Sequence, residues 1–225
     1  ADIRALIRVA ESLDDPQKEI IASTRLLRFY IECGRMHRAS KLAPRIETMV
    51  SRHHLDEVFA AVLGELNSEI ALARGLFDEA RDIAAEALEY TWDDQPGERR
   101  GRRQRFRLLR CLAKVDMNTG QLDRAREHMN EAMELASRME HRRYQAEART
   151  LLGEIAGRQA RYQSAVDHFK AALAIDRDLG DRYTTGVKLA NLGITYTAIG
   201  LYRRAERYLR KALELHEAIG HGMEA

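Results

Sequence analysis

The stretch YTTGVKLANLGITYTAIG, residues 183–200, is followed directly by LYRRAERYLRKALELHEAIG, residues 201–220. In each half, apolar residues recur at the three- and four-residue spacing of one helix face. Gly200 is predicted to end the first helix in the left-handed conformation, which glycine adopts at little cost. Small residues such as Gly193 and Ala205 let two helices joined by a short turn approach closely. The stretch therefore predicts an antiparallel pair of helices.

The same pattern returns five times along the 225 residues. A turn glycine, or once an alanine, stands five residues before an alanine in the pairs Gly34 and Ala39, Gly75 and Ala80, Gly120 and Ala125, Ala160 and Ala165, and Gly200 and Ala205. The steps between successive turns are 41, 45, 40 and 40 residues. A nearly fixed period of this length indicates a repeat array, in which each unit buries its apolar face on the next. We therefore expect an all-α solenoid of antiparallel helix pairs, with Gly220 ending the last helix.

The unit resembles a tetratricopeptide repeat. In the last unit the matching residues are Leu192, Gly193, Tyr196, Gly200, Ala205 and Ala212, and in the fourth they are Leu152, Gly153, Ala165, Phe169 and Ala172. The period is longer than the commoner one of about 34 residues. In this it is similar to Leu-Gly-Asn repeat adaptors, kinesin light chains and the sensor regions of bacterial signalling ATPases. The resemblance covers roughly residues 16–219 and implies a right-handed superhelical solenoid.

The predicted organisation is a single array over residues 1–225, cut from a longer protein, because the chain starts without methionine and in the middle of a helical pattern. Residues 1–13 are interpreted as the second helix of a preceding repeat. The five repeats are expected at residues 16–51, 55–91, 98–138, 141–178 and 182–219. Pro44 lies inside a helical pattern and is expected to bend or fray that helix. The longest step contains Trp92, Pro96 and Gly97, which indicate a longer loop.

Composition narrows the class of partner. The 37 basic and 35 acidic residues give a net charge of +2, too balanced to favour nucleic acid or a membrane surface. Seven arginines lie between Arg99 and Arg110, and we interpret them as a solvated helix start, so no nucleic-acid partner is predicted. Cys33 and Cys111 lie on apolar helical stretches and are expected to be buried, reduced thiols. With no signal-peptide pattern and no run of 18 apolar residues, we predict a cytoplasmic protein.

Common sequence motifs for catalysis are missing from the chain. The phosphate-binding, dinucleotide-binding, nucleophile-elbow and zinc-protease patterns do not occur in the chain. The one adjacent histidine pair, His53 and His54, falls at an expected turn, where neighbouring side chains point apart. We therefore predict no enzyme activity, no cofactor and no metal.

The candidate site follows from the resemblance, which implies that the first helices of successive repeats line a concave inner surface. The solvent-facing residues expected there are Arg107, Arg110 and Lys114 in the third repeat, Glu65 and Glu69 in the second, and Glu147 and Glu154 in the fourth. Two interpretations stay open. The charges neutralise each other as exposed ion pairs, each worth about 0–1 kcal/mol, or the arginines bind an acidic, carboxylate-bearing segment of a partner.

Reversal of the three basic residues, Arg107, Arg110 and Lys114, to glutamate is expected to leave the fold nearly intact and to reduce partner capture sharply. The family's clamp for chaperone tails needs lysine and asparagine residues on adjacent first helices. Only Asn191 stands at a fitting place, so chaperone-tail binding is not predicted.

The predicted function is that of a non-catalytic scaffold or regulatory module that binds a protein or peptide segment in its concave groove. The alternative is the ligand-sensing region of a larger bacterial signalling ATPase or transcription regulator, in which a small molecule is the effector. Self-association through uncapped ends of the array is a third expectation.

Overall fold

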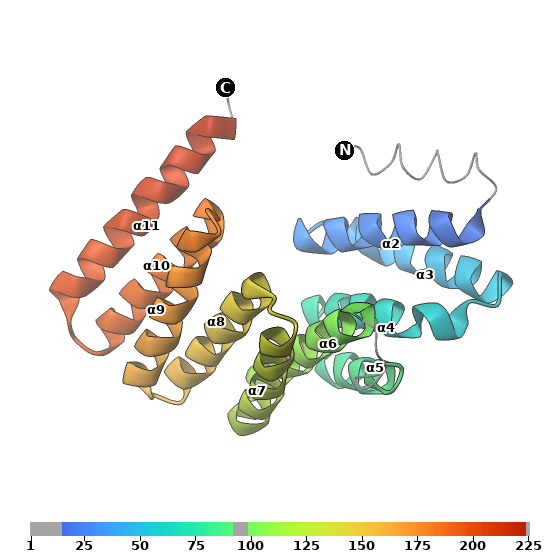
Figure 1. Ribbon diagram of the computed structural model, residues 1–225, viewed down its shortest axis with the longest axis horizontal. Helices are drawn as coiled ribbons and strands as arrows, with labels where there is room; N and C mark the ends of the chain where they lie inside the picture. The colour runs from blue at the N-terminus through green and yellow to red at the C-terminus, as the bar shows by residue number, and fades with distance from the viewer. Residues whose placement is uncertain (1–14, 92–98, 224–225) are drawn as a thin grey trace. The chain divides into compact units, whose positions relative to one another are not determined.

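The computed structural model describes residues 15–91 and 99–223, and these residues form α-helices without a strand (Figure 1). The prediction of an all-α fold is confirmed. The expected helix at residues 1–13 and the loop with Trp92, Pro96 and Gly97 lie outside the described residues. The helices are α2 (Pro16–Glu32), α3 (Met36–Arg52), α4 (Asp56–Ala73), α5 (Phe77–Glu89), α6 (Arg99–Asn118), α7 (Leu122–Arg138), α8 (Arg142–Arg158), α9 (Tyr162–Asp178), α10 (Arg182–Ala198) and α11 (Tyr202–Met223).

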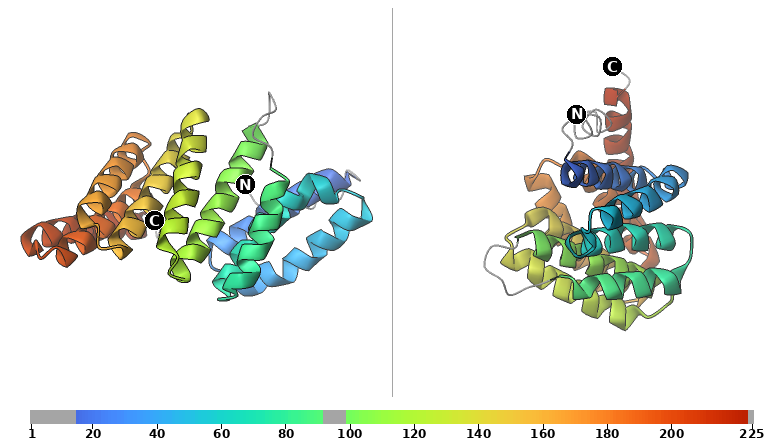
Figure 2. Two further views of the ribbon diagram at one scale, coloured as in Figure 1. Left: turned by 90° about the horizontal axis from the view of Figure 1, so that it is seen from below. Right: turned by 90° about the vertical axis from the view of Figure 1, so that its right-hand side faces the viewer.

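Contacts divide the chain into two compact units. Unit 1 ends at Thr119 and contains α2 to α6, whereas unit 2 begins at Gly120 and contains α7 to α11. Within each unit, helices that follow one another in the chain pack side by side (Figures 1 and 2). The helices α2, α4 and α6 are the first helices of three successive helix pairs. In unit 1, α4 contacts both α2 and α6.

The turns within the helix pairs have the predicted left-handed backbone. Gly34, Gly75, Gly120 and Gly200 have φ between 67° and 83°, and Ala160, which replaces the glycine in the fourth turn, has φ of 57°. At the last of these turns, the amide of Leu201 donates to the carbonyl of Tyr196 at 2.9 Å, a bond typical of a helix that ends in this conformation. The prediction for Gly220 is wrong, because α11 continues to Met223.

Unit 1 is built on an apolar cluster shared by α2, α3 and α4. Leu27, Ile46 and Phe59 lie at its centre, each with 0% of its surface exposed. Pro44 lies within α3 and does not end it, since the helix continues to Arg52. The expectation for Cys33 is wrong, because this residue caps α2 and is exposed. Cys111 of α6 is buried, as predicted.

Unit 2 is built on a second cluster, in which Phe169 of α9 packs with Leu192 and Tyr196 of α10. The helices cross closely where the sequence has glycine. A methyl group added at Gly153 would meet the Phe169 ring at 2.7 Å, and one added at Gly193 would meet the Leu209 side chain at 2.5 Å. The small residues of the repeat pattern therefore serve close helix packing, as expected.

Candidate functional site

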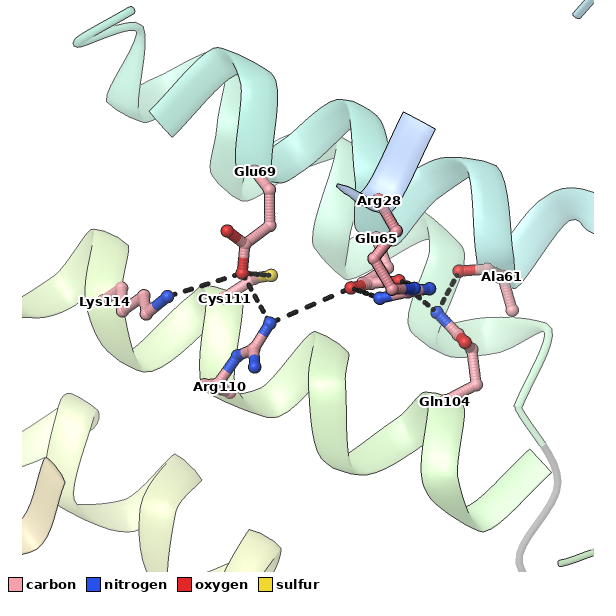
Figure 3. A network of polar contacts seen from close by, with 8 residues as sticks. All are labelled: Arg28, Ala61, Glu65, Glu69, Gln104, Arg110, Cys111 and Lys114. Atoms are coloured by element: carbon pink, nitrogen blue, oxygen red, sulfur yellow. Dashed lines mark hydrogen bonds and ion pairs between the residues drawn. The ribbon is translucent and has the colours of Figure 1, made fainter. Parts of the chain in front are cut away.

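A network of charged and polar side chains joins the three first helices of unit 1 (Figure 3). Arg28 of α2 donates from Nη1 and Nη2 to Oε1 and Oε2 of Glu65 on α4, at 2.5 and 2.6 Å. Gln104 of α6 donates from Nε2 to the Ala61 carbonyl at 2.9 Å and to Oε2 of Glu65 at 3.2 Å. Only 1% of Glu65 is exposed, so the expectation that it faces solvent is wrong. Donors from both α2 and α6 offset the cost of burying its carboxylate.

Glu69, one helical turn further along α4, is held by three residues of α6. Arg110 donates from Nη2 to Oε1 at 2.6 Å, the Cys111 thiol lies 3.5 Å from the same oxygen, and Nζ of Lys114 lies 3.4 Å from it. Burial by itself would raise the pKa of Glu69, but the charges of Arg110 and Lys114 lower it from 4.5 to about 2. Burial and the Glu69 carboxylate together raise the pKa of Cys111, so its thiol stays protonated and inert.

These contacts correct the expected effect of reversing the basic residues of α6. The Arg110 side chain is only 18% exposed and lies 2.6 Å from Glu69 and 3.8 Å from Glu65. A glutamate at position 110 would place three carboxylates together in a poorly solvated site. The change would therefore destabilise unit 1, and it does not isolate partner binding from folding.

A pocket of about 510 Å³ opens beside this network in unit 1. We call it the arginine pocket, because its lining includes Arg25 and Arg28 from α2 and Arg103 and Arg107 from α6. The remaining lining residues are Ile21, Thr24, Val62 and Gln104. Of the residues expected at a binding surface, only Arg107 lies here. The sequence shows that Arg25 and Arg28 are three residues apart and that Arg103 and Arg107 are four apart. It does not show that the two pairs line one pocket.

A second pocket, of about 410 Å³, lies in unit 2 between α8, α9 and α10. We call it the Asn191 pocket. Its lining includes Gly153, Glu154 and Gly157 from α8, Phe169 from α9, and Asn191 and Ile194 from α10. Glu154 was expected at a binding surface and lines the pocket. Glu147, which was also expected there, is half-buried on α8 and is not among the lining residues.

The Asn191 pocket combines a polar and an apolar feature. The side-chain Nδ2 of Asn191 is buried and has no hydrogen-bond partner among the described residues. Ile194, one turn along the same helix, leaves 63% of its surface exposed. Gly157 borders open space, since nothing lies within 4 Å of where its side chain would begin. Sequence reasoning considered Asn191 only for a chaperone-tail clamp and missed Ile194.

Two features often tied to function are absent from the described part of the chain. None of its helices combines the length and apolar character needed to cross a membrane. Over the same residues, no three or more His, Cys, Asp and Glu side chains gather where a metal ion would fit. His53 and His54 are both exposed at the turn after α3.

The helix pairs and their left-handed turns define a helical-repeat protein. Residues 104–178 match one family model described as tetratricopeptide repeat, and residues 185–219 match a second model of the same description. These two ranges are therefore similar to tetratricopeptide repeats, and the predicted resemblance is confirmed. Such repeats generally act as non-catalytic scaffolds for protein or peptide partners. No curated protein matches the sequence.

Solved structures with the same fold have low sequence identity. BtubC (BKLC) from P. vanneervenii is 18% identical with a TM-score of 0.72, over 98% of this chain and 93% of its own. Kinesin light chain-like repeats from P. anserina are 15% identical with a TM-score of 0.66, over 90% and 97%. The signal transduction ATPase with numerous domains from Pyrococcus horikoshii, which has a tetratricopeptide repeat sensor, is 14% identical with a TM-score of 0.68, over 94% of this chain and 32% of its own. These likenesses confirm the solenoid fold class.

Proposed function

We propose that this protein is a non-catalytic interaction module of the cytoplasm that binds a protein or peptide segment along its first helices. The observation that carries the proposal is the buried, unpaired Nδ2 of Asn191, a residue that lines a pocket together with the exposed Ile194. Tetratricopeptide repeats are scaffolds for such partners, which supports the class of ligand.

The chemistry of the pocket fits a peptide better than a purely apolar ligand. A buried donor without an acceptor costs about 1–3 kcal/mol, and a ligand carbonyl that accepts from it removes that cost. Every residue of a peptide offers one such carbonyl. A pocket of about 410 Å³ also falls in the range of ligand pockets and has room for an apolar side chain against Phe169 and Ile194. We therefore assign Asn191 to a peptide carbonyl and Ile194 to the side chain beside it.

Five of the seven charged residues expected at the groove divide into two roles under this proposal. Glu154 contributes to the peptide site in unit 2, where it lines the pocket. Glu65, Glu69, Arg110 and Lys114 hold α4 and α6 together, and Arg28 joins α2 to them. The ion pairs of this set, with distances of 2.5 to 3.8 Å, favour this role. The basic residues of the network are paired with Glu65 and Glu69, so the network itself gives no reason to expect an acidic partner.

The proposal is tested by selecting binders from a random-peptide display library on the full chain. Peptides that survive selection are synthesised, and their affinities for the parent chain and for Asn191→Ala are measured by calorimetry. We expect the variant to lose about tenfold or more in affinity, the equivalent of one hydrogen bond. Asn67→Ala is the matched control, because Asn67 also lies on a first helix but already donates to Glu47 at 2.7 Å. Selected peptides that bind Asn191→Ala as tightly as the parent chain contradict the proposal.

A second candidate function is the sensing of a small molecule within a larger signalling ATPase or transcription regulator. Its support is the shared fold with the P. horikoshii sensor and the arginine pocket of unit 1, whose volume of about 510 Å³ suits a small charged ligand. The two candidates differ in their ligand. The display experiment yields no peptides under the second, whereas a charged small molecule stabilises unit 1.

A further inference from the structure

We propose that the arginine pocket of unit 1 binds a phosphoryl group. This inference does not depend on the peptide site of unit 2, because different residues in a different unit carry it. It starts from the composition of the lining, which holds four arginines and no carboxylate. An arginine guanidinium remains charged at any pH at which the protein folds, so the pocket is a permanent site of positive charge.

The positive charge of the pocket is only partly balanced. Arg28 is neutralised by its two bonds to Glu65. Arg25 and Arg103 are exposed, and neither forms an ion pair with a described residue. Like charges gathered in one concave site repel each other, and an anion between them removes that repulsion. The pocket therefore favours an anionic ligand over a neutral one.

One arginine of the pocket is already fixed in position. Both terminal nitrogens of Arg28 are held by Glu65, whose second oxygen also accepts from Gln104, another lining residue. Fixed donors lose less entropy when a ligand binds than freely moving ones. Arg28 and Gln104 thus give a rigid wall to the pocket, and the exposed Arg25 and Arg103 are able to close on the ligand from α2 and α6.

The arrangement favours a phosphoryl group over a carboxylate. A carboxylate has two oxygens, which one arginine can satisfy by a bidentate pair. A phosphoryl group has three terminal oxygens and a charge near −2, so it accepts from guanidinium groups on two helices at once. The arginines here come from two helices, α2 and α6, that both pack on α4. The phosphoryl group has two sources, a free phosphorylated molecule and a phosphorylated side chain of a partner.

The test is calorimetric titration of the full chain with inorganic pyrophosphate and inorganic phosphate, with acetate as the singly charged comparison. We expect pyrophosphate to bind, and Arg25→Gln/Arg103→Gln to weaken that binding about tenfold or more. The matched control is Arg45→Gln/Arg52→Gln, which removes two exposed arginines of α3 outside the pocket. Since all four arginines are exposed, both variants are expected to melt near the parent temperature.

Three results would overturn the proposal: no heat of binding with either phosphate ion, equal binding of acetate, or equal weakening by the two double variants. The single variants Arg25→Gln and Arg103→Gln decide the matter if the double variant unfolds, because each is expected to weaken pyrophosphate binding on its own. A blocked phosphoserine tripeptide identifies the source. Tighter binding of this peptide than of pyrophosphate assigns the site to a phosphorylated partner, and weaker binding assigns it to a free phosphorylated molecule.

Discussion

Glu69 of α4 is an acidic residue whose pKa is strongly lowered by the fold. Burial raises its pKa, and the nearby Arg110 and Lys114 more than offset that effect, bringing it from 4.5 to about 2. Between these two pH values the unfolded chain binds more protons than the folded one. The stability that Glu69 contributes is therefore complete above about pH 5 and is lost as the pH falls toward 2.

We predict that Glu69→Gln makes the unfolding free energy less sensitive to acid. The parent chain should lose about 3 kcal/mol more than the variant between pH 5 and pH 2, since each pH unit of pKa difference corresponds to about 1.4 kcal/mol. Urea unfolding followed by circular dichroism at several pH values gives this comparison. Parallel curves for the two proteins would show that Arg110 and Lys114 do not lower the pKa of Glu69.

The ion pair of Arg28 and Glu65 allows a second prediction. It concerns which of the two substitutions, Arg28→Gln or Glu65→Gln, lowers the free energy of unfolding more. Arg28→Gln leaves a carboxylate that is only 1% exposed, whereas Glu65→Gln leaves a guanidinium on a side chain that is 20% exposed. Breaking a buried pair costs about 3–5 kcal/mol when the remaining charge is not solvated. We therefore expect Arg28→Gln to reduce the free energy of unfolding more than Glu65→Gln does. Urea unfolding at pH 7 measures both, and the opposite order would contradict the assignment of Glu65 as the buried partner.

At the scale of the helices, glycines have two distinct roles. A methyl group added to Gly64 of α4 would lie 2.2 Å from the Cβ of Ala87 on α5, whereas one added to Gly157 of α8 would meet nothing within 4 Å. Gly64→Ala should destabilise by about 1–3 kcal/mol through overpacking, reduced by the better helix propensity of alanine. Gly157→Ala should instead stabilise by up to about 1 kcal/mol. Thermal unfolding distinguishes them, and a stabilising Gly64→Ala would contradict the close crossing of α4 and α5.

The helices were predictable from the sequence because their causes are local. The apolar spacing of 183–200 and the glycine at position 200 are sufficient to predict a helix and its left-handed end, and Gly200 has φ of 83°. His54 and Glu140 also have positive φ, at turns between helix pairs, and neither residue type indicates this by itself. The helix end predicted at Gly220 is wrong. A glycine is compatible with a helix end but does not force one, and α11 continues through it.

The sites were less predictable than the helices because they depend on residues far apart in the chain. Arg28 and Glu65 are separated by 37 positions, and Glu69 and Arg110 by 41. The sequence indicated that Glu65, Glu69 and Arg110 lie on first helices. Which guanidinium meets which carboxylate depends on the packing of α2, α4 and α6. For the same reason, the burial of Glu65 and the unpaired amide of Asn191 were not visible in the residue pattern.

At the scale of the whole molecule, an exposed apolar residue should matter for binding only where it adjoins a pocket. Ile194 lines the Asn191 pocket and is 63% exposed, and Leu213 of α11 is 58% exposed outside that pocket. We predict that Ile194→Gln weakens a selected peptide about tenfold, as loss of one buried apolar side chain implies. Leu213→Gln is the matched control and should bind like the parent chain. Equal affinities for both variants, measured by calorimetry, would place the peptide elsewhere.

Under the proposed function, the side-chain amide of Asn191 donates a hydrogen bond to a bound peptide. Nitrogen–proton NMR of the side-chain amides tests this directly, with the Asn191 signals assigned by their loss in Asn191→Ala. On addition of a selected peptide we expect the two Asn191 amide protons to shift and to exchange more slowly with water, because one of them gains an acceptor. The Asn67 signals should stay unchanged. Unaltered Asn191 signals in the saturated complex would contradict the proposed function.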